Sequence, residues 1–217
     1  MSRANVVLGV DVDEDRRQRF DGLVAARAAG APLQYLEGSV PFGGVEIAVD
    51  DRVLIPRPET EFLFDTLARR CDPSTIVDLC TGSGNLAIAL ANRFPDAAVY
   101  ATDVAPDAVA VARQNAERNG VDVSIVAGDL FEPLPVGIRR SVDLLVANPP
   151  YLASHEFEGL PTDVKHEPYG ALVAGPVGDE VIHRIADGIG TWLADGAVIA
   201  LEVSEFHVHD VAPLFEA

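Results

Sequence analysis

The chain has 217 residues, of which 48% are hydrophobic, and its formal net charge at pH 7 is −18. This length allows one domain with a substantial core, and no apolar run approaches the length of a membrane span or of a signal peptide. Because an acidic surface repels phosphate backbones, we do not expect extended nucleic-acid binding. The two cysteines, Cys71 and Cys80, fit no metal or disulfide pattern, so we expect a reduced, cytoplasmic protein without a metal site. Because there is no long apolar run, we expect no membrane partner.

The first sixty residues predict a helix followed by a β-hairpin. Residues 13–29 have the pattern of a short amphipathic helix, and a glycine and a proline follow it. Residues 45–49 and 52–55 predict two short strands joined by a turn at Asp50-Asp51. Residues 59–70 then predict a second helix. We divide the chain into an N-terminal unit, residues 1–60, and a main domain, residues 61–217.

From residue 75 onward, apolar strands alternate with helices. The expected strands are 76–80, 98–103, 123–127, 142–147 and 197–203, and the expected helices are 86–94, 106–119, 179–193 and 208–215. This alternation predicts an α/β fold, a Rossmann-like doubly wound parallel sheet with helices on both faces. Ligands bind beyond the carboxyl ends of the strands in such sheets, and the unusual residues of this chain follow strand ends.

The first of these strands ends in a glycine-rich loop. In the run IVDLCTGSGNLAIAL, Gly82 and Gly84 allow a tight turn and a close approach of a ligand to the backbone. Dinucleotide-binding enzymes use G-x-G-x-x-G, but Ala87 stands at the third position here. The spacing D-x-x-x-G-x-G, which begins at Asp78, instead resembles the adenosylmethionine-binding loop of class I methyltransferases.

Two acidic residues follow the next two strands. Asp103 lies 19 residues beyond Gly84, where a carboxylate can accept both hydroxyls of a ribose; its alternative role is to cap the helix that begins near Pro106. NAD-dependent enzymes also have an acid there, so Asp103 indicates a ribose-bearing cofactor without identifying it. Asp129 is placed where class I methyltransferases contact the adenine amino group, or else it is an ordinary loop aspartate.

The fourth strand is followed directly by Asn148, Pro149, Pro150 and Tyr151. Proline ends a strand and fixes the backbone, so the acceptors beside it are preorganised. The side-chain oxygen of Asn148 and the carbonyl of Pro149 can accept the two N–H groups of a planar, weakly nucleophilic nitrogen, and Tyr151 can lie against its plane. We predict that these four residues are catalytic and aim such a nitrogen at a methyl donor.

The motif Asn-Pro-Pro-Tyr is shared by adenine-amino DNA methyltransferases and by the HemK/PrmC family of protein glutamine N(5)-methyltransferases. The acidic composition disfavours the DNA enzymes. Residues 32–61, PLQYLEGSVPFGGVEIAVDDRVLIPRPETE, resemble the HemK/PrmC signature that precedes the methyltransferase domain. Residues 165–172, KHEPYGAL, are similar to the segment that follows the motif in that family. The resemblance covers roughly residues 20–205.

This resemblance implies a class I methyltransferase fold, S-adenosyl-L-methionine as the cofactor, and methylation of the glutamine in the Gly-Gly-Gln loop of a peptide-chain release factor. Asn148 to Tyr151 would hold the glutamine amide. In the segment over the cofactor site, Arg57 and Glu59 would either contact the substrate or form a local ion pair. The residues that would contact the cofactor are Asp78, Cys80, Thr81, Gly82, Ser83, Gly84, Asp103, Asp129, Leu130 and Asn148.

The chain departs from the family at both ends. Only 31 residues precede Pro32, so we expect most of the family's helical docking domain to be absent. The final antiparallel strand pair is missing too, which indicates a truncated or divergent member, or a sheet completed by another chain, as in a homo-oligomer. Two alternatives stay open: methylation of another protein glutamine or of a small amide, amine or guanidine metabolite, and a non-catalytic adenosylmethionine-binding protein. The second is disfavoured because the whole Asn-Pro-Pro-Tyr motif is retained.

Overall fold

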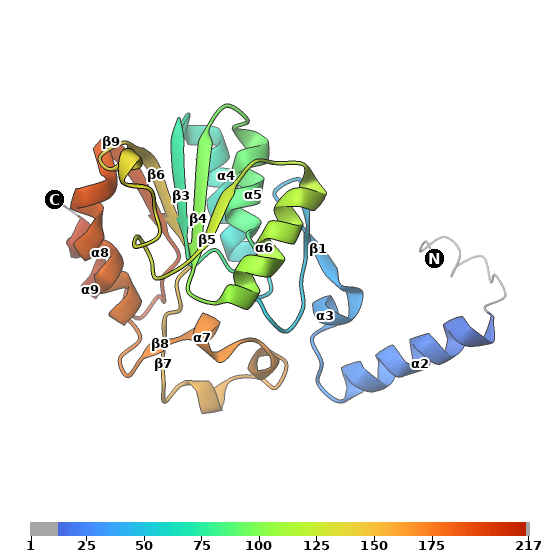
Figure 1. The fold of residues 1–217 in the computed structure, drawn as a ribbon. Coiled ribbons are helices and arrows are strands. Elements are labelled where there is room, and N and C mark those ends of the chain that lie inside the picture. The colour runs from blue at the N-terminus through green and yellow to red at the C-terminus, as the bar shows by residue number, and fades with distance from the viewer. Residues whose placement is uncertain (1–12, 216–217) are drawn as a thin grey trace.

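The computed structural model describes residues 13–215 and contains a central parallel sheet of five strands (Figure 1). The strands lie in the order β5-β4-β3-β6-β9. Their bounds are β3 (Thr75–Leu79), β4 (Ala98–Asp103), β5 (Ser124–Ala127), β6 (Val142–Ala147) and β9 (Leu193–Leu201). The chain therefore runs outward from β3 to β5 and returns to β6, and the crevice between β3 and β6 is the switch point where such sheets bind ligands.

Helices cover both faces of the sheet, as predicted (Figure 1). Successive strand residues point to opposite faces, so Ile76 packs in one core cluster with α4, α5 and α6, and Val77 packs in the other with α8. The helices are α4 (Pro58–Arg70), α5 (Asn85–Arg93), α6 (Pro106–Asn119) and α8 (Glu180–Trp192). The predicted α/β fold is confirmed, and each of these helices lies within one residue of its expected bounds.

The predicted hairpin is wrong in its second strand. The structure pairs β1 (Ser39–Phe42) with β2 (Val45–Ala48) in antiparallel register. The two-residue turn at Gly43-Gly44 has positive φ values of 54° and 86°, as a tight hairpin requires. Strand β1 was not predicted because Pro41 interrupts it, and proline is tolerated only at a sheet edge. Residues 51–53 instead form a turn and a bend, in which the Val53 N–H donates to the Asp50 carbonyl (3.1 Å), and residues 54–57 have no regular structure.

The hairpin belongs to the same core as the sheet. Phe42 and Ile47 are buried in the cluster that contains α5 and α6. Asn115 of α6, which is fully buried, accepts a hydrogen bond from the Ala48 N–H (2.8 Å) and donates to the carbonyls of Ala48 (3.0 Å) and Ser83 (2.9 Å). One side chain therefore links the hairpin to the glycine-rich loop.

The N-terminal helix α2 (Glu14–Ala28) extends away from this body (Figure 1). It begins after Asp13, whose side chain caps it, and none of its residues is buried. Phe20 is 63% exposed. The predicted helix is present, but its apolar side covers no core. A short helix, α3 (Leu33–Glu37), connects it to the hairpin. No helix in residues 13–215 is long and apolar enough to cross a membrane.

The segment between β6 and α8 lies across the carboxyl ends of the strands (Figure 1). It was not predicted as regular structure because its elements are very short. They are β7 (Leu152–Ala153), the 3-10 turns η2 (Phe157–Gly159) and η3 (Val164–His166), α7 (Tyr169–Leu172) and β8 (Val173–Gly175), and β7 pairs with β8 in parallel. The remaining short helices are η1 (Val136–Ile138), α9 (Val208–Val211) and η4 (Ala212–Phe215), so the predicted closing helix is broken into two turns.

Candidate active site

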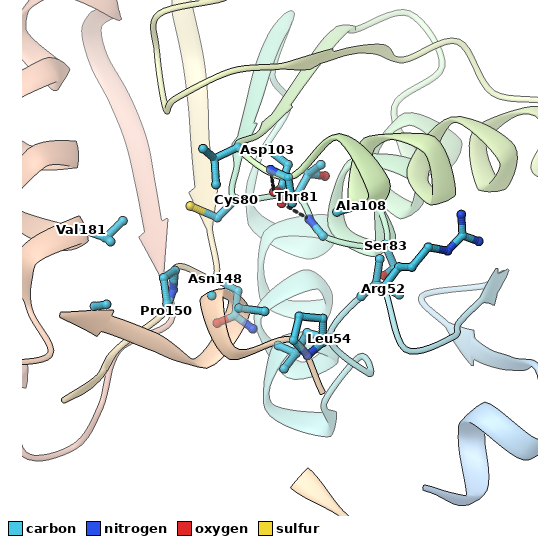
Figure 2. A pocket seen from close by; sticks show the side chains of 18 of the residues that line it. Arg52, Leu54, Cys80, Thr81, Ser83, Asp103, Ala108, Asn148, Pro150 and Val181 are labelled. Atoms are coloured by element: carbon cyan, nitrogen blue, oxygen red, sulfur yellow. Dashed lines mark hydrogen bonds between the residues drawn. The ribbon is translucent and has the colours of Figure 1, made fainter. Parts of the chain in front are cut away.

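A cavity of about 420 Å³ lies at the carboxyl ends of the central strands (Figure 2). This volume is in the range of small-molecule sites. Figure 2 shows Asp103, Cys80 and Thr81 on one side of the cavity and Asn148, Pro150 and Leu54 on the other. The sequence-predicted residues that line it are Cys80, Thr81, Gly82, Ser83, Asp103, Asp129, Leu130, Asn148 and Pro150. The structure thus brings the ends of four strands around one space.

Asp78 lies behind the glycine-rich loop and does not line the cavity. Its side chain is 1% exposed, and its Oδ2 accepts hydrogen bonds from the Thr81 hydroxyl (2.6 Å) and the Ala87 N–H (3.2 Å). Burial raises the pKa of the Asp78 carboxyl to about 7. We therefore assign Asp78 to holding the loop in shape, in place of the direct cofactor contact expected from the sequence.

The two glycines of the loop, Gly82 and Gly84, have different roles. A Cβ added at Gly82, where φ is 54°, would meet nothing within 4 Å, and this residue lines the cavity. A Cβ at Gly84, where φ is 81°, would come within 2.9 Å of the Ile88 side chain and 3.1 Å of Ala112. Gly82 therefore leaves room for a ligand, and Gly84 lets α5 pack against α6.

Asp103 faces the same space from the end of β4. Its Oδ2 accepts the Gly82 N–H (2.8 Å), and its Oδ1 accepts the Ala105 N–H (2.9 Å). Burial raises the pKa of Asp103, and these two hydrogen bonds oppose the rise. The N-cap of α6 is Ala105, so Asp103 does not cap that helix. Each carboxylate oxygen keeps a lone pair that a hydroxyl of a bound ligand can use.

Asp129 pairs with Arg184 of α8, and both residues line the cavity. The distance from Arg184 Nη2 to Asp129 Oδ2 is 2.5 Å. The next residue, Leu130, has a positive φ of 47°, a strained conformation that is often found at binding sites, and its carbonyl accepts the Thr102 hydroxyl (2.8 Å). Sequence reasoning did not find Arg184, because nothing near it in the chain indicates a partner 55 residues away.

The Asn-Pro-Pro-Tyr turn forms the opposite wall. Asn148 Nδ2 donates to the Thr60 hydroxyl (3.2 Å), and that hydroxyl donates to Glu202 Oε2 (2.6 Å). Asn148 and Pro150 line the cavity, whereas Pro149 is buried and Tyr151 is half-buried beside them. Burial raises the pKa of the Tyr151 hydroxyl, and the nearby charge of Glu202 adds to this.

Arg57 pairs with Glu167 and not with Glu59, so of the two alternatives the local ion pair of Arg57 with Glu59 is wrong. The distance from Arg57 Nη2 to Glu167 Oε1 is 2.5 Å, and Glu167 Oε2 accepts the Ile55 N–H at 3.0 Å. Glu167 is 4% exposed. Because residues on both sides of this contact line the cavity, the ion pair joins the segment 52–57 to the segment 167–174 as one wall.

Comparison with known proteins identifies the family. Residues 58–163 match the family model of the methyltransferase small domain. The release factor glutamine methyltransferase of Moorella thermoacetica is 42% identical over 190 residues, which are 85% of this chain and 66% of that protein. The corresponding protein of Mycolicibacterium smegmatis is 40% identical over 208 residues, which are 93% of this chain and 72% of that protein. The chain belongs to the release factor glutamine methyltransferase family. It spans about two thirds of the length of these relatives.

Solved structures of lower identity share the fold. The ribosomal protein L11 methylase of Lactobacillus delbrueckii subsp. bulgaricus has a TM-score of 0.54 at 20% identity, over 77% of this chain and 72% of that one. A tRNA (uracil-54, C5)-methyltransferase of Pyrococcus abyssi has a TM-score of 0.53 at 17% identity, over 82% of this chain and 37% of that one. These likenesses confirm the class I methyltransferase fold.

The cofactor of this family, S-adenosyl-L-methionine, fits the residues of the cavity. Asp103 offers free carboxylate lone pairs for the ribose hydroxyls, and Gly82 leaves space beside the backbone. Asp129 keeps one oxygen that does not bond to Arg184. In residues 13–215, no three His, Cys, Asp or Glu side chains are grouped as metal ligands. Burial raises the pKa of the Cys80 thiol, so this residue contributes shape and not a thiolate.

Proposed function

We propose that the chain is an S-adenosylmethionine-dependent N-methyltransferase of a protein glutamine, and that its substrate is the Gly-Gly-Gln loop of a peptide-chain release factor. The observation that carries this proposal is the retained Asn148 to Tyr151 turn at the cavity wall, opposite Asp103. It occurs in a chain that is about 40% identical to relatives named release factor glutamine methyltransferases.

The residues of the site suit an amide nitrogen as the acceptor. When bound, the cofactor supplies a methyl group on a positively charged sulfur, and Asp103 and Gly82 hold its ribose side. Asn148 Oδ1 and the Pro149 carbonyl accept the two N–H groups of the glutamine amide and so aim its nitrogen. Tyr151 lies against the amide plane. Once the nitrogen has bonded to the methyl group, its N–H protons become more acidic. The nitrogen then loses one proton to solvent by way of the acceptor that binds it, so no base has to remove the proton beforehand.

We further propose that residues 1–60 contribute to binding of the protein substrate and that the enzyme acts in the cytoplasm. Support for the first point comes from α2, which buries none of its residues and leaves Phe20 63% exposed. Support for the second comes from the two unpaired cysteines. The net charge of −18 disfavours a nucleic acid as the substrate.

A transfer assay tests the proposal. The chain is incubated with methyl-labelled S-adenosylmethionine and either a release factor or its variant in which the glutamine of the Gly-Gly-Gln loop is replaced by alanine. The proposal predicts label in the unaltered release factor only. Equal labelling of both proteins would place the methyl group elsewhere, and no labelling would favour a different substrate.

A further inference from the structure

Three side chains from separate parts of the chain form one hydrogen-bonded row at the cavity, and two of them, Thr60 and Asn148, line it. Glu202 follows β9, Thr60 lies in the first turn of α4, and Asn148 follows β6. The Thr60 hydroxyl donates to Glu202 Oε2 at 2.6 Å and accepts from Asn148 Nδ2 at 3.2 Å. Thr60 is 1% exposed. Thr60 and Glu202 lie 142 residues apart in the sequence, and neither was part of the predicted site.

When Glu202 is ionised, the two hydrogen bonds of the row can run in only one direction, from Asn148 to Thr60 and from Thr60 to Glu202. A carboxylate only accepts hydrogen bonds, and a hydroxyl has a single proton to donate. The proton of Thr60 is therefore committed to Glu202, and its oxygen can only accept. Of the two ends of the Asn148 amide, only the NH₂ end can donate to that oxygen. Turning the amide by half a rotation would set Oδ1 against the lone pairs of Thr60, which costs a buried hydrogen bond.

The backbone keeps the two ends of the row together. The Glu202 N–H donates to the Ala147 carbonyl at 3.0 Å, which continues the pairing of β9 with β6. Ala147 directly precedes Asn148, so the carboxylate and the amide project from neighbouring strand ends. Thr60 lies in the first turn of α4, two residues after Pro58, and its hydroxyl contacts both side chains.

We propose that Thr60 and Glu202 are positioning residues that lock the amide of Asn148 with its oxygen toward the substrate. The inference rests on the proposed function, because its purpose is to present an acceptor to the glutamine N–H. In the reversed orientation, the Asn148 NH₂ would face the NH₂ of the substrate and repel it. Loss of one preorganised polar group in an active site commonly lowers turnover by about a hundredfold.

The lock depends on the charge of Glu202. Once protonated, this carboxyl can donate to Thr60, whose own proton is then free to bond to Asn148 Oδ1, and the amide can turn. Burial raises the pKa of Glu202 and the nearby Glu59 adds to this, while the hydrogen bond from Thr60 and the charge of Arg57 oppose it. Tyr151 also faces the group and is neutral here because its pKa is raised. The lock is therefore present when the pH is above the raised pKa of Glu202 and is lost as the pH falls through it.

The side-chain amide signals of Asn148 in the nitrogen-15 spectrum test the lock without any substrate. They are assigned by their absence in Asn148→Asp. We expect slow hydrogen exchange of this NH₂ group in the wild type and in Thr60→Ser, and exchange at least tenfold faster in Thr60→Val and Glu202→Gln. The control is Thr66→Val, which removes a hydroxyl that bonds only to the Phe62 carbonyl of the same helix. Unchanged exchange in Thr60→Val and Glu202→Gln, or equal change in Thr66→Val, would overturn the proposal.

Steady-state kinetics provide a second test of the proposed role of Thr60 and Glu202. Thr60→Val and Glu202→Gln should lower kcat for the release factor by about 10- to 100-fold, with the affinity for S-adenosylhomocysteine within about twofold of the wild type. The decline of kcat at acid pH should disappear in Glu202→Gln. If the exchange results hold but the wild type methylates no release factor, the proposed substrate is wrong and the lock stands. If transfer occurs but exchange is unaffected, the lock is wrong and the proposed function stands.

Discussion

Replacing Glu167 by alanine should destabilise the protein more than any surface change of the same kind. The carboxylate is 4% exposed and bonds to both the Arg57 guanidinium and the Ile55 N–H. The substitution leaves these two donors without an acceptor in a place that water barely reaches. Arg57 itself keeps 29% of its side chain exposed, so part of its charge can be hydrated again.

The magnitude follows from these contacts. Breaking a buried ion pair by removing one partner costs about 3–5 kcal/mol, and an unsatisfied backbone N–H costs about 1–3 kcal/mol. Because Arg57 is partly exposed, we take the lower end and expect a loss of about 3 kcal/mol in the free energy of unfolding. For a domain of this size, this corresponds to a fall in Tm of roughly 6–12 °C.

Urea unfolding followed by circular dichroism measures this loss. The control is Glu158→Ala in the same segment, because Glu158 is 88% exposed and contacts Lys165 at 3.4 Å. An exposed ion pair contributes about 0–1 kcal/mol, so this variant should unfold almost as the wild type does. Losses of equal size in the two variants would refute the claim that the ion pair of Arg57 with Glu167 fastens the cavity wall.

Four other predictions follow from the site. Asn148→Ala should abolish methyl transfer and change affinity for S-adenosylhomocysteine less than threefold by calorimetry. Gly84→Ala should lower the free energy of unfolding by about 1–3 kcal/mol in urea, because of its positive φ and the 2.9 Å approach to Ile88. Asp78 holds its proton more tightly when folded, so stability should fall as the pH rises from about 4 toward 7, and urea titrations of Asp78→Asn should show a shallower fall. Deleting residues 1–29 should raise KM for the release factor and change the unfolding free energy by less than about 1 kcal/mol, because α2 buries nothing.

The parts of the fold that could be predicted carry their signals locally. The helix α6 has its expected bounds because Pro106 fits a first turn and Gly120 ends it in the left-handed conformation, with φ of 66°. The strand β6 also has its expected bounds, because its apolar run begins at Val142 and prolines follow it directly. The position of Asp103 at a strand end followed from the same alternation.

The parts that could not be predicted depend on residues distant in the chain. Asp50-Asp51 was predicted as the turn, but the hairpin closes at Gly43-Gly44, and Phe42 at the end of β1 is buried in the core cluster that contains α5. The partner of Asp129 lies 55 residues away, and the partner of Arg57 lies 110 residues away. Such pairs form only when the folded sheet brings strand ends together, and no spacing rule encodes them.

The most direct test of the account is the site of methylation itself. A release factor is incubated with the chain and S-adenosylmethionine, and the peptide that contains its Gly-Gly-Gln loop is fragmented in a mass spectrometer. The account predicts the added mass of one methyl group on the side chain of that glutamine with the wild type, and none with Asn148→Ala. A methyl group on any other residue, or methylation by Asn148→Ala at the wild-type rate, would contradict it.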